Sequence, residues 1–82
     1  MPLSELRDSK KVIGSKQVRK AINKGQAKKV FLANDAEPHI TGPLMEMCQN
    51  NNIEVDLAWN MKTLGEACGI EVGAAAVALI SE

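Results

Sequence analysis

The chain has 82 residues, of which 45% are hydrophobic, so we expect one globular domain spanning residues 1–82 with a single modest core. Its formal net charge is zero, but nine basic and two acidic residues up to Lys29 give that part a charge of +7, and one basic and eight acidic residues give the remainder −7. Nothing in the first residues has the character of a signal peptide, and no apolar run is long enough to cross a bilayer, which favours a soluble, cytoplasmic protein.

The first predicted elements lie between residues 3 and 25. Residues 3–11 have the apolar spacing of a short helix, and residues 12–13 predict a brief strand. A clearer helix follows, because Ser15 can cap its N-terminus and Gly25 can end it in the left-handed conformation. Its apolar residues recur at i, i+3 and i+4, which predicts one buried face: Val18, Ala21 and Ile22.

The rest of the chain alternates strands and helices. The continuous apolar run Val30–Ala33 is typical of a central strand covered on both faces. Residues 38–51 predict a helix that Gly42 and Pro43 interrupt, with Pro43 in the first turn of the true helix. A strand with one wet face, a helix and a buried strand are then predicted in turn: residues 53–57, 61–68 and 74–80. This alternation predicts an α/β sandwich, with a four-stranded sheet between helix layers.

Catalysis, cofactors and metals find little support in the sequence. Cys48 and Cys68 stand in apolar, helix-like surroundings, which favours buried, reduced thiols over a disulfide or a metal pair. His39 is the single histidine and has no nucleophile beside it, and neither a phosphate-binding loop motif nor a GxSxG motif is present. We therefore expect a binding protein without catalytic residues, cofactor or metal.

The predicted basic helix carries the strongest chemical signal. Lys16, Lys20 and Lys24 recur at i, i+4 and i+8, on one ridge, while Gly14 lets another backbone approach the helix end. Free N–H groups at a helix N-terminus favour phosphate, and the amide of Gln17 can contact base edges. An ordinary solvated helix face is the alternative interpretation, but together with the charge of +7 the ridge favours nucleic acid.

The aromatic content narrows the kind of nucleic acid. Proteins that bind single strands usually offer aromatic side chains on which bases stack. Here the aromatic residues are Phe31, in a predicted buried strand, and Trp59. The sequence therefore favours a folded, duplex-like RNA, and a helix can reach base edges in such an RNA only where a bend or unusual pairs open the deep major groove.

Three segments together resemble the L-seven-Ae family of kink-turn RNA-binding proteins, which includes ribosomal and small-nucleolar-particle members. The segment from Gly14 to Ala21 is similar to the family's Gly-Thr-Asn-Glu-x-x-Lys-Ala, and the segment from Ala33 to Pro38 to its Ala-x-Asp-Ala-Glu-Pro. The third segment runs from Leu64 to Val72 and continues through Ala74–Ala78. The resemblance covers about residues 13–80, and the short length is similar to bacterial members of the YbxF type.

The resemblance implies a fold, a partner and a site. The fold is a three-layer α-β-α sandwich with a four-stranded mixed sheet, and the partner is a kink-turn in ribosomal RNA or a riboswitch, bound by a monomer. The basic helix is expected to enter the widened groove beside tandem sheared G·A pairs, with Glu37 near the extruded nucleotide. The residues expected to contact the G·A pairs and the flanking phosphates are Gly14, Ser15, Lys16, Gln17 and Lys20. Those expected to cover the unpaired loop bases are Ile70, Glu71 and Val72.

The sequence departs from the family pattern at two positions of the basic helix. Lys16 stands where asparagine is usual, which replaces an amide with a point charge suited to phosphate. Gln17 stands where glutamate is usual and keeps an acceptor oxygen for guanine. An alternative function is a ribosome-associated protein-interaction module that uses the acidic half of the chain, including Glu54 and Asp56.

Overall fold

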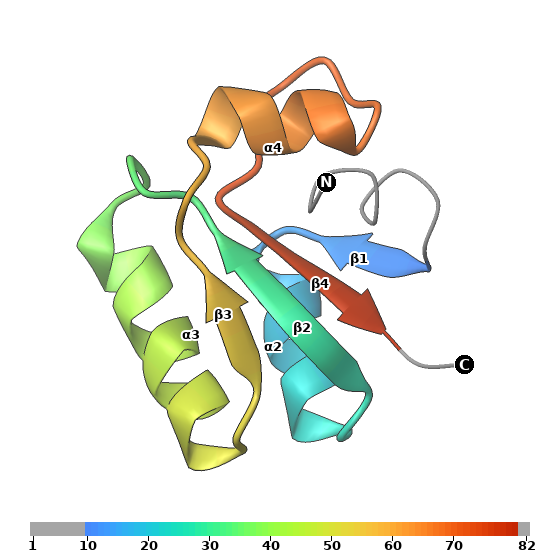
Figure 1. Ribbon diagram of the computed structural model, residues 1–82, viewed down its shortest axis with the longest axis vertical. Coiled ribbons are helices and arrows are strands. Elements are labelled where there is room, and N and C mark those ends of the chain that lie inside the picture. The colour runs from blue at the N-terminus through green and yellow to red at the C-terminus, as the bar shows by residue number, and fades with distance from the viewer. Residues whose placement is uncertain (1–9, 81–82) are drawn as a thin grey trace.

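The computed structural model describes residues 10–80, which form an α/β fold with three helices and a four-stranded mixed sheet (Figure 1). The elements in chain order are β1 (Lys11–Ile13), α2 (Ser15–Asn23), β2 (Ala27–Leu32), α3 (Pro38–Asn50), β3 (Glu54–Asp56), α4 (Met61–Ala67) and β4 (Ala76–Ile80). The predicted first helix lies almost wholly outside the described residues, and Lys11, which was expected to end it, begins β1 instead.

The sheet has the strand order β1-β4-β2-β3. The last strand, β4, pairs antiparallel with both β1 and β2, whereas β2 and β3 run parallel. Val77 of β4 lies between Ile13 on one side and Phe31 on the other. The sheet is therefore mixed, as predicted, and β1 and β2 both end beside the start of β4.

The sheet separates two apolar clusters, which makes the fold a three-layer sandwich (Figure 1). Val30 and Leu32 of β2 face α2 and α3, while Phe31 packs with Leu64 of α4 on the other face. Side chains alternate in direction along a strand, so a strand buried on both sides must be apolar at every position. The prediction that Val30–Ala33 is such a strand is confirmed.

Helix α2 buries the predicted stripe of Val18, Ala21 and Ile22, but the predicted N-terminal cap is wrong. Gly14 occupies the cap position, with φ at 101°, and no side chain caps the helix. Ser15 is already helical, because the positive φ that the chain needs to turn from β1 into α2 falls on the preceding glycine. The predicted end at Gly25 is confirmed: it has a φ of 70°, and its N–H bonds to the Ile22 carbonyl.

Helix α3 runs without interruption from Pro38 to Asn50, so the predicted break at Gly42 and Pro43 is wrong. A proline inside a helix removes one hydrogen bond and its ring crowds the preceding turn. In α3 the residue before the proline is a glycine, which has no Cβ to meet the ring. The residue that does stand in the first turn is Pro38.

The remaining elements follow the prediction in kind and order but are shorter: β3 covers residues 54–56, α4 ends at Ala67 and β4 begins at Ala76. Strand β3 ends at Asp56, whose Oδ1 accepts a 2.8 Å hydrogen bond from the Ala58 N–H, and Leu57 beyond it is 45% exposed rather than part of an alternating strand. Helix α4 begins at the Asn60 cap, and Gly69 follows its last turn with a φ of 78°. Among residues 10–80, no helix is long and apolar enough to span a membrane.

Candidate nucleic-acid interface

The three segments singled out in the sequence meet at one end of the sheet. The Gly14 N–H donates a 2.9 Å hydrogen bond to the Ala76 carbonyl, and the Ala33 N–H donates one of the same length to the Ala75 carbonyl. These bonds hold the start of α2 and the loop after β2 on either side of the chain that enters β4. Because the third segment leads directly into β4, all three lie around one point although up to about sixty residues separate them.

The N-terminus of α2 presents cationic and amide groups to solvent. Lys16, Gln17 and Lys20 are exposed, whereas Gly14 and Ser15 are partly buried. The first turn contains no acidic residue, and the first backbone hydrogen bond of the helix runs from Val18 to Gly14. The N–H groups before Val18 therefore lack helical partners, and their dipoles add to the positive field of the lysines.

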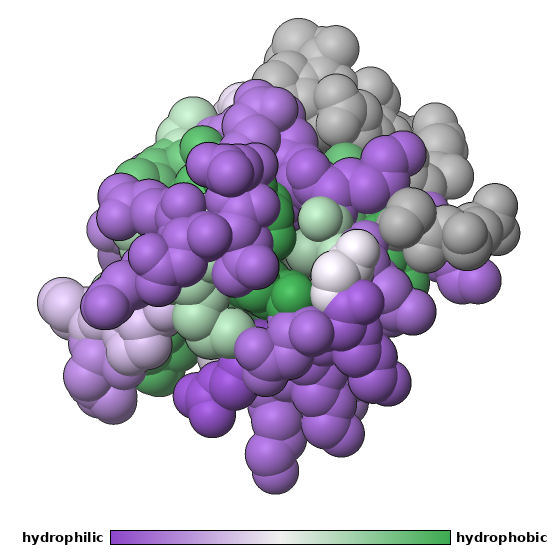
Figure 2. Space-filling view, turned by 90° about the horizontal axis from the view of Figure 1, so that it is seen from below, coloured by the Kyte–Doolittle hydropathy of each residue, from purple (hydrophilic) through white to green (hydrophobic). Residues whose placement is uncertain are grey.

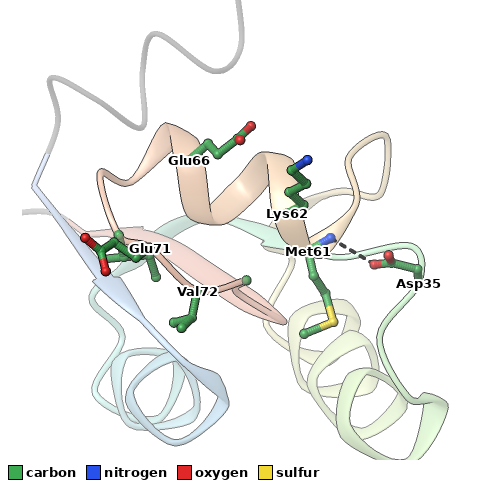
Figure 3. Close-up of a pocket in the computed structure, with 8 residues that line it drawn as sticks. Asp35, Met61, Lys62, Glu66, Glu71 and Val72 are labelled. Atoms are coloured by element: carbon green, nitrogen blue, oxygen red, sulfur yellow. Dashed lines mark hydrogen bonds between the residues drawn. The ribbon is translucent and has the colours of Figure 1, made fainter.

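The loop between β2 and α3 is tied to the start of α4. The Asn34 N–H donates to the Trp59 carbonyl at 2.9 Å, and Asp35 Oδ1 accepts from the Met61 N–H at 2.8 Å (Figure 3). Glu37 is exposed at the N-cap of α3, where its Oε2 lies 3.0 Å from His39 Nδ1. The two bonds to the α4 side fix the loop that leads into Glu37 and α3.

The loop between α4 and β4 carries an exposed apolar side chain on a fixed backbone. Val72 is 71% exposed, Ile70 is partly buried and Glu71 is exposed. A Cβ on Gly65 of α4 would overlap the Val72 carbonyl oxygen, so the loop lies directly on the helix backbone at this glycine. Fixing the backbone lowers the entropy that a contact through Val72 would otherwise lose on binding.

Gly65 was not among the residues predicted for the site. Its position inside a predicted helix could have pointed to it. A glycine there weakens the helix by about 0.5–1 kcal/mol relative to alanine, which suggests that close packing requires the missing side chain. The structure supplies that reason in the contact with Val72.

A shallow pocket of about 320 Å³ opens between the start of α4 and the α4–β4 loop. Figure 3 shows Asp35 and Met61 on one side of it and Glu71 and Val72 on the other. Its lining mixes apolar and charged groups: Asp35, Met61, Lys62, Glu66, Ile70, Glu71, Val72 and Gly73. Only Ile70, Glu71 and Val72 of these were among the predicted site residues. The other five were missed because no sequence pattern indicates that Asp35, the start of α4 and the α4–β4 loop line one cavity.

The cysteines do not join this site. Burial raises the pKa of both thiols, and for Cys68 the charge of Lys11 opposes the rise. Cys48 is fully buried, as predicted, whereas Cys68 is only partly buried; both are free cysteines. A thiol with a raised pKa is a poor nucleophile at neutral pH. Within residues 10–80, no group of three or more His, Cys, Asp or Glu side chains is arranged to hold a metal ion.

Comparison with known proteins identifies the class to which this fold and site belong. The sequence model of the ribosomal protein L7Ae/L30e/S12e/Gadd45 family matches residues 3–82, and the chain belongs to this family. The predicted resemblance is thereby confirmed.

Particular relatives are similar over most of their length. An RNA-binding protein of Geobacillus sp. (strain WCH70) is 45% identical over 75 residues, which are 92% of each chain. The RNA-binding protein YbxF of Geobacillus stearothermophilus is 41% identical over 75 residues, again 92% of each. The fold matches that of the Giardia lamblia 15.5kD RNA binding protein with a TM-score of 0.89 at 22% identity, covering 99% of this chain and 72% of that one.

Proposed function

We propose that this protein binds RNA and recognises kink-turns, docking α2 beside the tandem sheared G·A pairs and stabilising the kinked form. The observation that carries the proposal is the meeting of three segments at the start of β4, held by the bonds from Gly14 to Ala76 and from Ala33 to Ala75. The relatives described as RNA-binding proteins support the RNA part of it. The segments themselves support the kink-turn part, through their likeness to the family's motifs.

The N-terminus of α2 is the reason why we propose a bent RNA and not a regular duplex as the partner. An α-helix does not fit the deep, narrow major groove of regular A-form RNA, so its N-terminus needs a groove widened by a kink and by non-Watson–Crick pairs. In such a groove Lys16 and Lys20 neutralise phosphates, while Gln17 offers both a donor and an acceptor to a base edge. Gly14 and Ser15 bring the backbone close, and the free N–H groups of the first turn add to the attraction.

The α4–β4 loop and Glu37 account for contact with unpaired nucleotides. Val72, the most exposed of the large apolar side chains in the described part of the chain, provides an apolar surface for a loop base next to Ile70 and Glu71. Glu37 stands across the site at the start of α3, where its carboxylate can accept a hydrogen bond from an extruded base. A contact of this kind requires unstacked bases, which a kink supplies and a regular duplex does not.

A titration against a short RNA with a standard kink-turn tests the proposal, with fluorescence transfer between the two stem ends reporting the bend. The control RNA has its G·A pairs changed to Watson–Crick pairs. We expect tight binding and increased transfer with the first RNA alone. Equal binding to both RNAs that weakens in parallel with added salt would contradict shape recognition and leave a general phosphate-binding helix.

The role of Lys20 is tested by its alanine variant. We expect Lys20→Ala to weaken binding and to reduce the slope of log affinity against log salt by about 1, because one phosphate contact is lost. Lys29→Gln is the control: Lys29 lies on β2, where its Nζ is 3.7 Å from Glu54 Oε2. The same loss from both variants would show that total charge, and not the position of Lys20, determines affinity.

We further propose that the protein acts as a monomer in the cytoplasm, without a cofactor and without catalysis. Its target is a kink-turn in ribosomal RNA or in a riboswitch. Size-exclusion chromatography of the protein with and without the kink-turn RNA tests the stoichiometry, for which we expect one protein on one RNA. A complex with two protein copies on one kink-turn would contradict a monomeric unit.

A further inference from the structure

The basic ridge of α2 extends well beyond the helix N-terminus. Lys16, Lys20 and Lys24 follow one another at intervals of four residues and are all exposed. At 1.5 Å per residue, the ridge spans about 12 Å along the helix. Helix α2 contains no acidic residue to separate these charges, and like charges four residues apart destabilise a helix by a few tenths of a kcal/mol per pair.

A β-bulge adds a fourth lysine at the far end of the ridge. Ala27 pairs with Ile80 and Lys29 with Leu79, so Lys28 is an extra residue in β2. Lys28 is exposed and follows Lys24, the C-cap residue of α2, by four residues across a short turn, so its charge lies at the C-terminal end of α2. Figure 2 shows hydrophilic residues over most of the end of the molecule where α2 finishes and β2 begins.

The charges of these four lysines are not balanced by ion pairs in the described part of the chain. Within residues 10–80, none of Lys16, Lys20, Lys24 and Lys28 forms an ion pair. A cation near a helix C-terminus interacts favourably with the helix dipole, which accounts in part for Lys20 and Lys24. It accounts for neither Lys16, at the opposite end, nor Lys28, on the neighbouring strand. A polyanion alongside the helix would neutralise all four.

We propose that α2 lies lengthwise against the backbone of one RNA stem, so that Lys24 and Lys28 bind phosphates beyond the kink. The inference rests on the proposed function and adds to it a requirement for stem length. A helix inserted end-on would use only the charges at its tip, whereas a line of charge along its exposed side fits a strand that runs beside it. Successive phosphates of one duplex strand lie about 3 Å apart along the axis, so a 12 Å ridge corresponds to roughly four base pairs of stem.

The experiment combines a protein variant with shortened RNAs. The protein is the double variant Lys24→Gln, Lys28→Gln. Lys29→Gln is a single-charge control on the same strand as Lys28, since Lys29 lies on the α4 side of the sheet with Phe31 and is paired with Glu54. Three kink-turn RNAs are compared: one with two long stems, and two in which one stem or the other is cut to the pairs next to the kink. Thermal unfolding of each variant shows that the proteins remain folded at the assay temperature.

With the long-stem RNA, we expect the double variant to bind more weakly and to lose about 1–2 from the salt slope, whereas Lys29→Gln binds as the original chain does. Shortening one particular stem should weaken the original chain by the same factor and leave the double variant unaffected, because the two changes remove the same contacts. The other stem should behave differently: its shortening should weaken both proteins equally.

Two results would overturn the inference while the proposed function stands. The first is unchanged binding of the double variant to the long-stem RNA. The second is a double variant whose affinity, relative to that of the original chain, falls by the same factor with the long-stem RNA and with both shortened RNAs. The two lysines would then contribute only a general electrostatic attraction. Failure of the original chain to prefer the kink-turn over its Watson–Crick control would instead overturn the proposed function and the inference with it.

Discussion

Replacing Gly65 with alanine tests how the α4–β4 loop is held. Gly65 lies inside α4, where alanine is normally the better residue, by about 0.5–1 kcal/mol. Helix propensity alone therefore predicts that Gly65→Ala raises stability. The structure predicts the reverse, because the new methyl group would overlap the carbonyl oxygen of Val72 and also approach the Cα of Gly73 at 3.2 Å.

The expected loss of stability depends on which atoms must move to make room for the methyl group. The overlapping atom belongs to the backbone and cannot rotate away as a flexible side chain can, so the cost lies in the upper part of the roughly 1–3 kcal/mol typical of overpacking. After the gain in helix propensity is subtracted, we expect a loss of about 1–2 kcal/mol. For a domain of this size, that corresponds to a fall in Tm of roughly 4–16 °C.

Thermal unfolding followed by circular dichroism measures the effect, and Glu66→Ala is the control in the same helix. Glu66 is exposed, so its removal should change stability by no more than about 0.5 kcal/mol. If the clash is relieved by movement of the loop, the fall in Tm is smaller but Val72 is displaced, and affinity for the kink-turn RNA falls instead. A Gly65→Ala protein with raised Tm and unchanged affinity would refute the reasoning.

Three further predictions concern stability. Asn60→Ala should cost about 0.5–2 kcal/mol in urea unfolding, since its Oδ1 accepts a 2.7 Å bond from the Thr63 N–H, and Asn60→Asp should retain most of that stability. Leu44→Ala should cost about 2–5 kcal/mol by the same assay, because its side chain is fully buried between α3 and the sheet; a smaller cost would mean that the cluster collapses into the cavity. Stability should fall as pH rises past about 8.5, because burial raises the pKa of Cys48 and Cys68 in the folded state and the unfolded chain therefore loses its thiol protons first. The double alanine variant of the two cysteines should show a shallower alkaline fall.

Much of the fold was predictable because local patterns and the final packing agree. The apolar run Val30–Ala33 had to be covered on both faces, and the stripe of Val18, Ala21 and Ile22 had to face a core, whatever the strand order. The errors occurred where one residue determines the backbone. Ser15 has the chemistry of a cap, but the positive φ of the turn fell to Gly14. Pro43 has the chemistry of a helix breaker, but the glycine before it and the packing of Leu44 keep α3 continuous.

The residue types of the candidate site were also determined by the sequence. The charge of +7 up to Lys29, the lysine ridge and the three motifs can be found without coordinates, and the family they indicated is the one to which the chain belongs. Their chemistry depends on side-chain type and on helical periodicity, which are local properties.

The relative positions of these parts could not be predicted from the sequence. Hydrogen bonds from Gly14 to Ala76 and from Ala33 to Ala75 join segments that no local pattern relates, because strand pairing is a long-range choice. The contact between Gly65 and Val72, and the register shift of β2 at Lys28, likewise arise from how distant parts of the chain pack. Side-chain chemistry and local periodicity, which can be read from the sequence, set which groups this protein presents, and the packing of the sheet and its helices brings the segments that carry them together around the start of β4.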